Sequence, residues 1–191
     1  MKRSEINNAI RSAQSAFTEG GWVLPPHPRW DVTEFGLGEF RKTGLVLINL
    51  AEEPEYCEKL MFSLPGQITP MHTHRVKKED IICRRGRLSL ELWAGHPQSC
   101  RAGEPVSLSR NGSEFTAASG QPFTLEAGER VTLIPGVYHA FWGDSEAGCI
   151  IGEVSTANDD ASDNIFVDVR IGRFPSVEED EPALVRLVGE S

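Results

Sequence analysis

Three of the five histidines and one glutamate have the types and spacing of ligands for a single metal ion. His72 and His74 are separated by one residue, so on an extended strand both side chains would lie on one face. Glu79 has the opposite parity, and the charged segment before it must turn or bulge before its carboxylate can join them. His139 follows Pro135-Gly136, a pair typical of turns. Together these residues could offer imidazole nitrogens and a carboxylate oxygen to one ion.

This donor set favours Mn²⁺, Fe²⁺, Co²⁺, Ni²⁺ or Zn²⁺ over calcium, which prefers oxygen ligands alone. A six-coordinate ion held by these four groups keeps up to two open positions. Open positions allow a substrate to bind and react. The ligand set therefore predicts a functional metal.

The first histidine pair lies in a segment framed by glycines. Gly66, His72, His74, Glu79 and Gly86 occupy the glycine, histidine, glutamate and glycine positions of the first cupin motif, at its spacing. The segment therefore resembles the cupins, a superfamily of small β-barrel proteins.

The later segment resembles the second cupin motif. Gly128, Gly136 and His139 are correctly separated, whereas Pro135 sits one place later than usual and Gly143 replaces the usual asparagine. The two motifs imply an all-β fold, a cupin double-stranded β-helix or jelly-roll-like barrel with an N-terminal helix and peripheral segments. Cupins of this kind commonly pair, so the resemblance also implies a homodimer.

Short apolar runs bounded by glycine, proline and asparagine predict the strands of this barrel. They cover residues 45–50, 60–64, 81–83, 88–93, 123–125, 130–134, 140–142 and 148–154. The polar, turn-rich segment 95–120 predicts an elaborated hairpin or loop between the barrel halves, of a kind that often lies over a barrel mouth.

The two ends of the chain have other patterns. From Ser4 to about Phe17, apolar residues recur at three- and four-residue spacing, which predicts a helix that ends at Gly20-Gly21. The prolines of segment 25–28 predict an extended connection. The acidic run near the C-terminus is interpreted as solvated surface without a role. We expect a single domain over 1–191, made of a helix and extended arm (1–43), the barrel (44–175) and the acidic segment (176–191).

The composition of the chain argues against some classes of binding partner. The net charge of -9 argues against nucleic acid, because binding to a phosphate backbone needs clustered lysine and arginine. No apolar run approaches the roughly 20 residues that span a bilayer, and the opening residues lack the apolar centre of a signal peptide. We therefore expect a cytoplasmic protein with no membrane partner. No Cys-x-x-Cys pair occurs, so we expect free thiols at Cys57, Cys83, Cys100 and Cys149.

Residues around and beyond the metal ligands resemble one cupin family in particular, the D-lyxose isomerases. The similar segments are Met71-His72-x-His74 with Lys77, Glu79-Asp80-Ile81-Ile82, Gly152-Glu153-Val154-Ser155-Thr156, and Asn158-Asp159-Asp160 through Asp163-Asn164. The resemblance implies a metal-dependent isomerase that interconverts D-lyxose and D-xylulose, and also D-mannose and D-fructose, through a metal-stabilised cis-enediolate. It implies a small sugar as partner and one divalent ion as cofactor, with Mn²⁺ favoured and Co²⁺, Ni²⁺, Fe²⁺ and Zn²⁺ as alternatives.

For the isomerase activity that the resemblance implies, the candidate catalytic residues are Glu153 and Lys77. Glu153 is a carboxylate on the apolar strand 149–154, where burial would raise its pKa and suit it to carry a proton. Lys77, beside the ligand turn, could bind sugar oxygens or stabilise the enediolate. Both are also expected to bind substrate, together with Asp163, which would bind a distal hydroxyl or assist ring opening. Two neighbours compete with it for that role, Asp159 and Asp160.

The sequence also allows several alternative functions. A phosphosugar isomerase would need a cationic clamp, for which the candidates are Arg75, Lys77, Lys78, Arg84, Arg85 and Arg87. An Fe²⁺ dioxygenase would use the open metal positions for oxygen, and a sugar-binding module would perform no reaction. A hydride shift between the two sugar carbons would make Glu153 less essential. Three aromatic residues either shape the pocket or belong to the core: Tyr138, Phe141 and Trp142.

Overall fold

The computed structural model describes residues 1–156, 162–171 and 177–190. One helix and thirteen strands follow one another along the described chain. They are α1 (Arg3–Glu19), β1 (Arg29–Thr33), β2 (Leu45–Glu52), β3 (Tyr56–Ser63), β4 (Ile68–His74), β5 (Glu79–Arg85), β6 (Arg87–Trp93), β7 (Pro105–Arg110), β8 (Ser113–Ala118), β9 (Phe123–Glu126), β10 (Arg130–Leu133), β11 (Tyr138–Gly143), β12 (Cys149–Thr156) and β13 (Asn164–Phe166).

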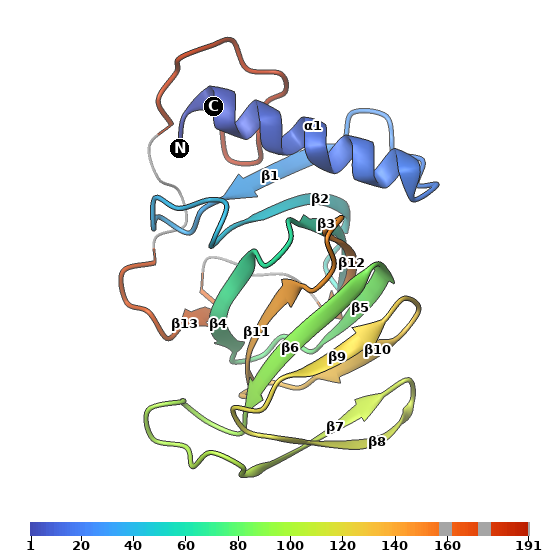
Figure 1. Ribbon diagram of the computed structural model, residues 1–191, viewed down its shortest axis with the longest axis vertical. Coiled ribbons are helices and arrows are strands. Elements are labelled where there is room, and N and C mark those ends of the chain that lie inside the picture. Colours follow the sequence, from blue (N-terminus) through green and yellow to red (C-terminus); the bar gives the residue numbers. More distant parts are fainter. Residues whose placement is uncertain (157–161, 172–176, 191) are drawn as a thin grey trace.

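The strands form two antiparallel sheets that face each other across an apolar core (Figure 1). The larger sheet has the order β1-β2-β3-β12-β5-β10-β7-β8, and the smaller has the order β13-β4-β11-β6-β9. Consecutive strands such as β4 and β5 lie in different sheets, so the chain crosses repeatedly between the two layers. This is the arrangement predicted from the two cupin motifs, and every predicted strand is present.

Helix α1 lies across the outer face of β1 and β2, away from the barrel interior (Figure 1). It begins one residue before the predicted start and ends at the predicted glycine pair. Ile10 and Phe17 are fully buried, and the ring of Phe17 stacks on Trp30 of β1 with centroids 6.2 Å apart. Alternate residues of β1 therefore pack against the helix, which leaves the others to face the barrel interior.

The acidic C-terminal segment is exposed, as predicted, but it also has a structural role. Glu179 and Glu190 both accept hydrogen bonds from the buried guanidinium of Arg3, at 2.6 Å. Asp180 accepts bonds from the backbone amide and the hydroxyl of Ser4. Negative charge at a helix N-terminus is favourable because the first amides have no partner within the helix. The segment thus holds the start of α1.

Some strands, among them β1, β7, β8 and β13, lie outside the apolar runs that predicted the barrel. β1 lies in the proline-bounded arm, whose extended connection hid a strand that pairs with β2 along five residues. Segment 95–120 contains the predicted hairpin as β7 and β8, which turn at Asn111 and Gly112, both with positive φ. That hairpin extends the large sheet beside β10 and adds Val106 and Leu108 to the core.

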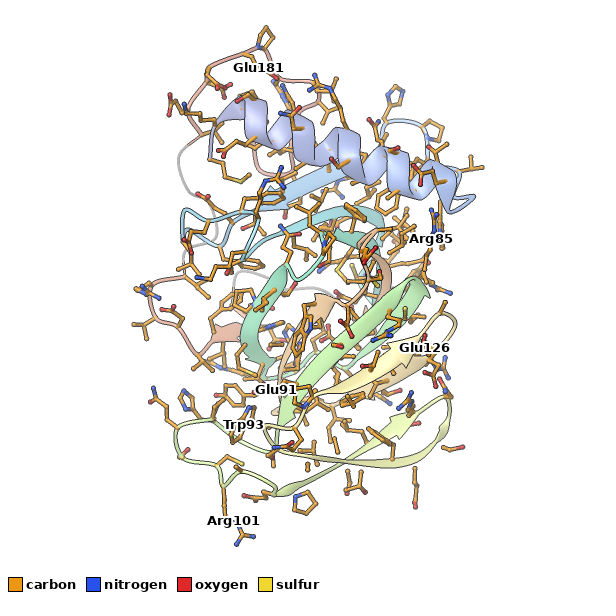
Figure 2. The ribbon with its side chains drawn as sticks, viewed as in Figure 1. Arg85, Glu91, Trp93, Arg101, Glu126 and Glu181 are labelled. Carbon is orange, nitrogen blue, oxygen red and sulfur yellow. The ribbon has the colours of Figure 1, made fainter. Side chains whose placement is uncertain are left out.

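Several charged side chains lie on the outside of the molecule. Figure 2 shows Arg101, Glu126 and Glu181 pointing away from the sheets. All four cysteines are free thiols, as predicted, and the sulfurs of Cys83 and Cys149 lie 3.9 Å apart, at the distance of a thiol hydrogen bond and without a disulfide. Within the described residues, no helix is both long enough and apolar enough to cross a membrane.

Replacing Phe17 by alanine tests how far α1 supports the sheet. The ring is fully buried between Trp30 and Phe62, so its loss leaves a cavity. We expect the free energy of unfolding to fall by about 3–5 kcal/mol, measured by urea denaturation. The exposed helix residue Arg11 provides the control, since Arg11→Ala should change stability by less than about 0.5 kcal/mol. Equal effects of the two changes would show that α1 is not packed as described.

Candidate metal centre and active site

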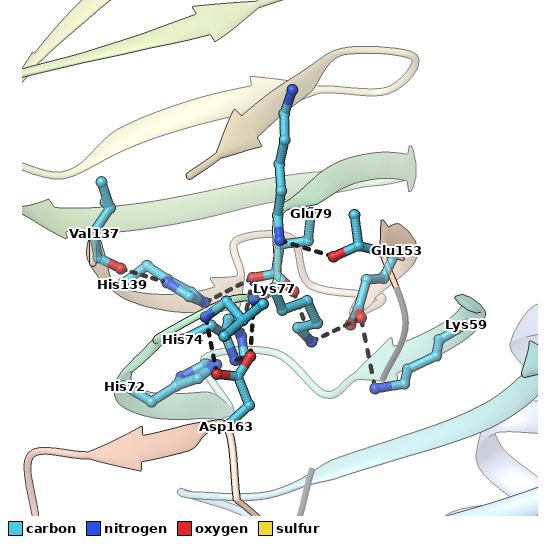
Figure 3. A network of polar contacts seen from close by, with 12 residues as sticks. Lys59, His72, His74, Lys77, Glu79, Val137, His139, Glu153 and Asp163 are labelled. Carbon is cyan, nitrogen blue, oxygen red and sulfur yellow. Dashed lines mark hydrogen bonds and ion pairs between the residues drawn. The ribbon is translucent and has the colours of Figure 1, made fainter. Parts of the chain in front are cut away.

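Four predicted ligands converge at one point inside the barrel (Figure 3). His72 and His74 lie on β4, and His139 lies on β11 directly opposite His72 in the strand register. Ligand atoms of the three histidines lie within 4.8 Å of one another. Oε1 of Glu79 is 3.0 Å from Nε2 of His139 and 3.4 Å from Nε2 of His74. All four side chains are buried, with exposed fractions of 1–7%.

Glu79 reaches the histidines despite its opposite parity because it lies in a different sheet from His72 and His74. His74 ends β4 in the small sheet and Glu79 begins β5 in the large one, so the intervening turn carries the carboxylate across the barrel. Asp163 holds this turn: its Oδ1 accepts the backbone N–H groups of Arg75 and Val76, at 2.8 and 3.0 Å. Its Oδ2 accepts the N–H of Lys77 at 2.9 Å. The predicted turn is therefore fixed by a single carboxylate.

The turn before His139 is anchored to the first histidine strand. Gly136 has φ of +86°, a conformation that L side chains rarely adopt, and its N–H donates to the carbonyl of His74 at 2.9 Å. Gly143 ends β11, and a Cβ there would lie 3.2 Å from the backbone oxygens of Ser63 and Leu64. This close approach favours glycine where the motif usually has asparagine.

The donor atoms fit a divalent cation. Nε2 of His74, Nε2 of His139 and Oε1 of Glu79 are buried and have no hydrogen-bond partner among the described residues. Nδ1 of His72 lies 2.7 Å from the carbonyl of Pro70, an arrangement that favours a proton on Nδ1 and a lone pair on Nε2. Burial, followed by the charges of His139 and His74, lowers the pKa of His72 well below its usual value. Neutral imidazoles and an ionised carboxylate are the forms that bind metals.

A chain of buried charges connects the metal ligands to Glu153. Nζ of Lys77 lies 2.9 Å from Oε2 of Glu79 and 3.0 Å from Oε1 of Glu153 (Figure 3). Nζ of Lys59 lies 3.5 Å from the same oxygen of Glu153. Lys59 was not among the residues predicted from the sequence. The sequence shows only a lysine next to the apolar run of β3, and it is the strand register of the structure that places this lysine opposite Glu153.

The lysines reverse the pKa shift that was predicted for Glu153. Burial alone would raise this pKa, but the positive charges of Lys59 and Lys77 outweigh burial and lower it. The prediction of a raised value was wrong because it considered burial without the cations. Burial likewise lowers the pKa of Lys77, and the charges of Glu153 and Glu79 reverse that effect and raise it. Both groups are therefore ionised at neutral pH.

The structure gives Asp163 a positioning role in the ligand turn. Burial opposes ionisation of this carboxyl, but hydrogen bonds from three backbone N–H groups outweigh burial and lower its pKa. It does not line the cavity beside the metal ligands within the described chain, so its binding of sugar stays a prediction. Asp159 and Asp160 lie outside the described residues.

A cavity of about 260 Å³ opens onto three of the predicted ligands, His72, His74 and Glu79, and onto Glu153. Its wall includes Lys59, Lys77 and several apolar side chains, and Phe141 is the one predicted aromatic residue that contributes among the described residues. Tyr138 instead packs against His96. No residue of the β7–β8 hairpin lines the described cavity. The hairpin is at the opposite edge of the large sheet from β1.

Comparison with known proteins identifies the family of this chain. The sequence model of the D-lyxose isomerase family matches residues 28–191. The chain is 34% identical to a D-lyxose/D-mannose isomerase of Serratia proteamaculans, over 95% of this chain and 94% of that protein. A D-lyxose ketol-isomerase of Cohnella laeviribosi is 31% identical, over 95% of this chain and all of that protein. The chain belongs to the D-lyxose isomerase family. As a member of this family, it is a sugar isomerase that interconverts aldoses and ketoses.

Solved structures give the same fold at lower sequence similarity. An L-ribose isomerase of Cellulomonas parahominis has a TM-score of 0.69 and 18% identity, over 93% of this chain and 98% of that chain. The L-ribose isomerase of Geodermatophilus obscurus has a TM-score of 0.67 and 19% identity, over 89% and 94%. These neighbours confirm the cupin fold of this family member.

Asp163→Ala tests whether this residue acts through the ligand turn. Loss of its hydrogen bonds should loosen the segment that carries Glu79, and we expect metal affinity to fall by about 10- to 100-fold. Metal content after equilibrium dialysis measures the effect. Asp168→Ala is the matched control, because within the described residues that carboxylate contacts only the exposed Arg170, and its loss should leave metal affinity unchanged. A variant with normal metal affinity but a raised sugar KM would instead support direct sugar binding by Asp163.

Proposed function

We propose that this sugar isomerase interconverts D-lyxose with D-xylulose and D-mannose with D-fructose, using one divalent ion held by His72, His74, Glu79 and His139. The observation that carries the proposal is the buried ligand cluster beside Glu153, which two lysines keep ionised within a small cavity. Relatives named D-lyxose/D-mannose isomerase support this choice of sugars. Mn²⁺ is the favoured ion, and Co²⁺, Ni²⁺, Fe²⁺ and Zn²⁺ are alternatives.

A divalent ion bound here supplies a Lewis acid that polarises the sugar carbonyl and stabilises negative charge on the sugar oxygens. Glu153 takes the proton from C2 of the open-chain aldose. The electron pair of the broken C–H bond forms the C1–C2 double bond of a cis-enediolate, and the carbonyl oxygen takes the negative charge. Return of the proton from Glu153 to C1, with transfer of the O2 proton to O1, gives the ketose.

Lys77 has a separate part in this scheme. Its ammonium group is buried between Glu79 and Glu153, so it can donate a hydrogen bond to a sugar oxygen while it orients the base. A fixed cation that faces developing negative charge lowers the barrier without reorganisation of solvent. Lys59 supports the same carboxylate from the other side, from the strand that pairs with β12.

The cations of the cavity favour a free sugar over a phosphosugar. Lys59 and Lys77 are the lysines that line the cavity, no arginine lines it within the described residues, and both lysines contact Glu153. The candidate clamp residues Arg84, Arg85 and Arg87 lie outside this wall. A phosphate would therefore compete with Glu153 for its counterions.

The homodimer and the cytoplasmic location stay predictions.

Anaerobic turnover of D-lyxose tests the reaction and its metal dependence. We expect metal-stripped protein to form no D-xylulose and protein reconstituted with Mn²⁺ to form it without oxygen. Parallel samples with Co²⁺, Ni²⁺, Fe²⁺ and Zn²⁺ rank the ions. Equal turnover with and without metal would contradict the metal role. A requirement for oxygen would favour a dioxygenase, and the absence of turnover with any free sugar would refute the proposal.

Glu153→Gln tests the base. We expect kcat to fall by about 10²- to 10⁴-fold, because the amide cannot accept the carbon proton. Metal content measured alongside shows whether the site is intact, and Glu146→Gln on an exposed loop is the matched control with unchanged kcat. Turnover of the wild type in D₂O separates the routes: proton transfer places deuterium on C1 of the ketose, whereas a hydride shift retains the original hydrogen.

A further inference from the structure

A tight turn directly after β1 contains a phenylalanine in an unusual backbone conformation. The N–H of Leu37 donates to the carbonyl of Glu34 at 3.0 Å, and the two residues between them, Phe35 and Gly36, have φ of +56° and +75°. Two successive positive φ values spanned by such a bond are features of a type I′ turn, whose central positions usually hold asparagine, aspartate or glycine. Phe35 is therefore a bulky residue in a conformation that bulky residues rarely adopt.

Two further hydrogen bonds fix this turn. The hydroxyl oxygen of Thr33 accepts the backbone N–H of Phe35 at 2.9 Å. The carboxylate of Glu34, itself buried, accepts from the α-amino group of Met1 at 3.1 Å. Strained residues persist where the surrounding structure fixes them, and they cluster at functional sites. The surroundings of the turn thus hold Phe35 in a conformation that sets the position of its ring.

The ring of Phe35 lies in the wall of the sugar cavity, close to the predicted metal ligands. It lines the cavity and is buried. It meets the ring of Phe166 edge-on, with centroids 5.7 Å apart. Phe166 lies opposite His72 in the register of β13 and β4, and its ring centroid is 5.3 Å from that of the imidazole. One aromatic ring therefore separates Phe35 from a predicted ligand.

The cavity wall at these two rings is apolar. Ile171 lines the same cavity and packs with Phe166 against the barrel core. A phenyl ring cannot hydrogen-bond a sugar hydroxyl, so Phe35 acts on a bound sugar through the volume that it occupies. The cavity of about 260 Å³ lies just below the roughly 300–1,000 Å³ that is usual for small-molecule sites. In so small a space, one ring of the wall decides how long a bound chain can be.

An open-chain sugar bound at the ligands has its far end within reach of this wall. C1 and C2 must lie beside Glu153 and the ligand cluster, and the remaining carbons occupy the rest of the cavity. D-Lyxose and D-mannose have the same configuration from C2 to C4, and D-mannose has one further CHOH group beyond it. The two sugars can therefore be distinguished only where the cavity receives that end.

We propose that Phe35 is the specificity-determining residue that limits the length of the sugar chain, because its ring occupies the volume that a sixth carbon needs. This inference rests on the proposed function. The strained turn then has a purpose, since it holds the ring in the wall at the distance of one aromatic side chain from His72.

Replacement of Phe35 by smaller and larger residues tests this role. We would measure kcat/KM for D-lyxose and D-mannose with the Mn²⁺-loaded wild type, Phe35→Ala, Phe35→Gly and Phe35→Trp. Removal of the ring should raise the D-mannose to D-lyxose ratio by about 10-fold, the scale of one carbon in an apolar pocket, and Phe35→Trp should lower it. Because the same two sugars are compared in each protein, their different ring-opening equilibria cancel.

The alanine and glycine variants separate the ring from the backbone strain. Both remove the ring, so both should change the ratio equally. Phe35→Gly should be the more stable of the two in urea denaturation, because glycine adopts positive φ without strain. Phe35→Gly is accordingly the variant to use if Phe35→Ala does not fold.

A phenylalanine elsewhere in the barrel is the matched control. Phe115 on β8 packs against the ring of Phe123 with centroids 5.1 Å apart, and it does not line the described cavity. Phe115→Ala should leave the ratio of the two sugars unchanged. Metal content and urea denaturation identify the folded variants.

Inhibition of the wild type provides a measurement that needs no variant. D-Arabinitol and D-mannitol are the reduced, open-chain forms of D-lyxose and D-mannose, and D-arabinitol should be the stronger inhibitor. Equal inhibition by the two polyols, or an unchanged sugar ratio in the folded Phe35 variants, would overturn this inference alone if the wild type is active. A wild type that isomerises neither D-lyxose nor D-mannose would overturn both the inference and the proposed function.

Discussion

Charge pairing inside the barrel is the constraint on which the site depends. Glu79 and Glu153 are both buried, and an isolated carboxylate in such a place would be neutralised or would destabilise the fold. Lys77 contacts both of them, and Lys59 contacts Glu153. Because one ammonium group is shared, the ligand carboxylate and the proposed base cannot be placed independently. The positions of these two carboxylates therefore depend on the same ion pairs that allow them to be buried.

The residues of the site are divided between the two sheets. The three histidines come from the small sheet, whereas the two carboxylates and Lys59 come from the large sheet. The turn that Asp163 holds is one of the covalent connections between the two sheets, and it also carries Lys77. Helix α1 covers the outer face of β1 and β2, so the apolar packing outside the barrel supports the strands that line the cavity inside.

Much of this organisation could be predicted from the sequence because the signals were local. The spacing of His72, His74 and Glu79 defined the ligands and the need for a turn between them, and the apolar runs located the strands. The contribution of Lys59 could not be predicted, since its partner on β12 is distant in sequence and only the strand register brings them together. The pKa shift of Glu153 was predicted with the wrong sign for the same reason, since it depends in part on the positive charge of Lys59.

The strand register also has a consequence for how the protein folds. The bond between Lys77 and Glu153 joins residues 76 positions apart, and Asp163 contacts Arg75 at a separation of 88. Contacts of this range form only after large loops have closed, which makes folding slow in comparison with helical proteins of similar stability. The histidine pair of β4 therefore gains its other predicted ligands only when distant strands are brought to it. The predicted metal site and the charge pairs beside it both depend on closure of the barrel.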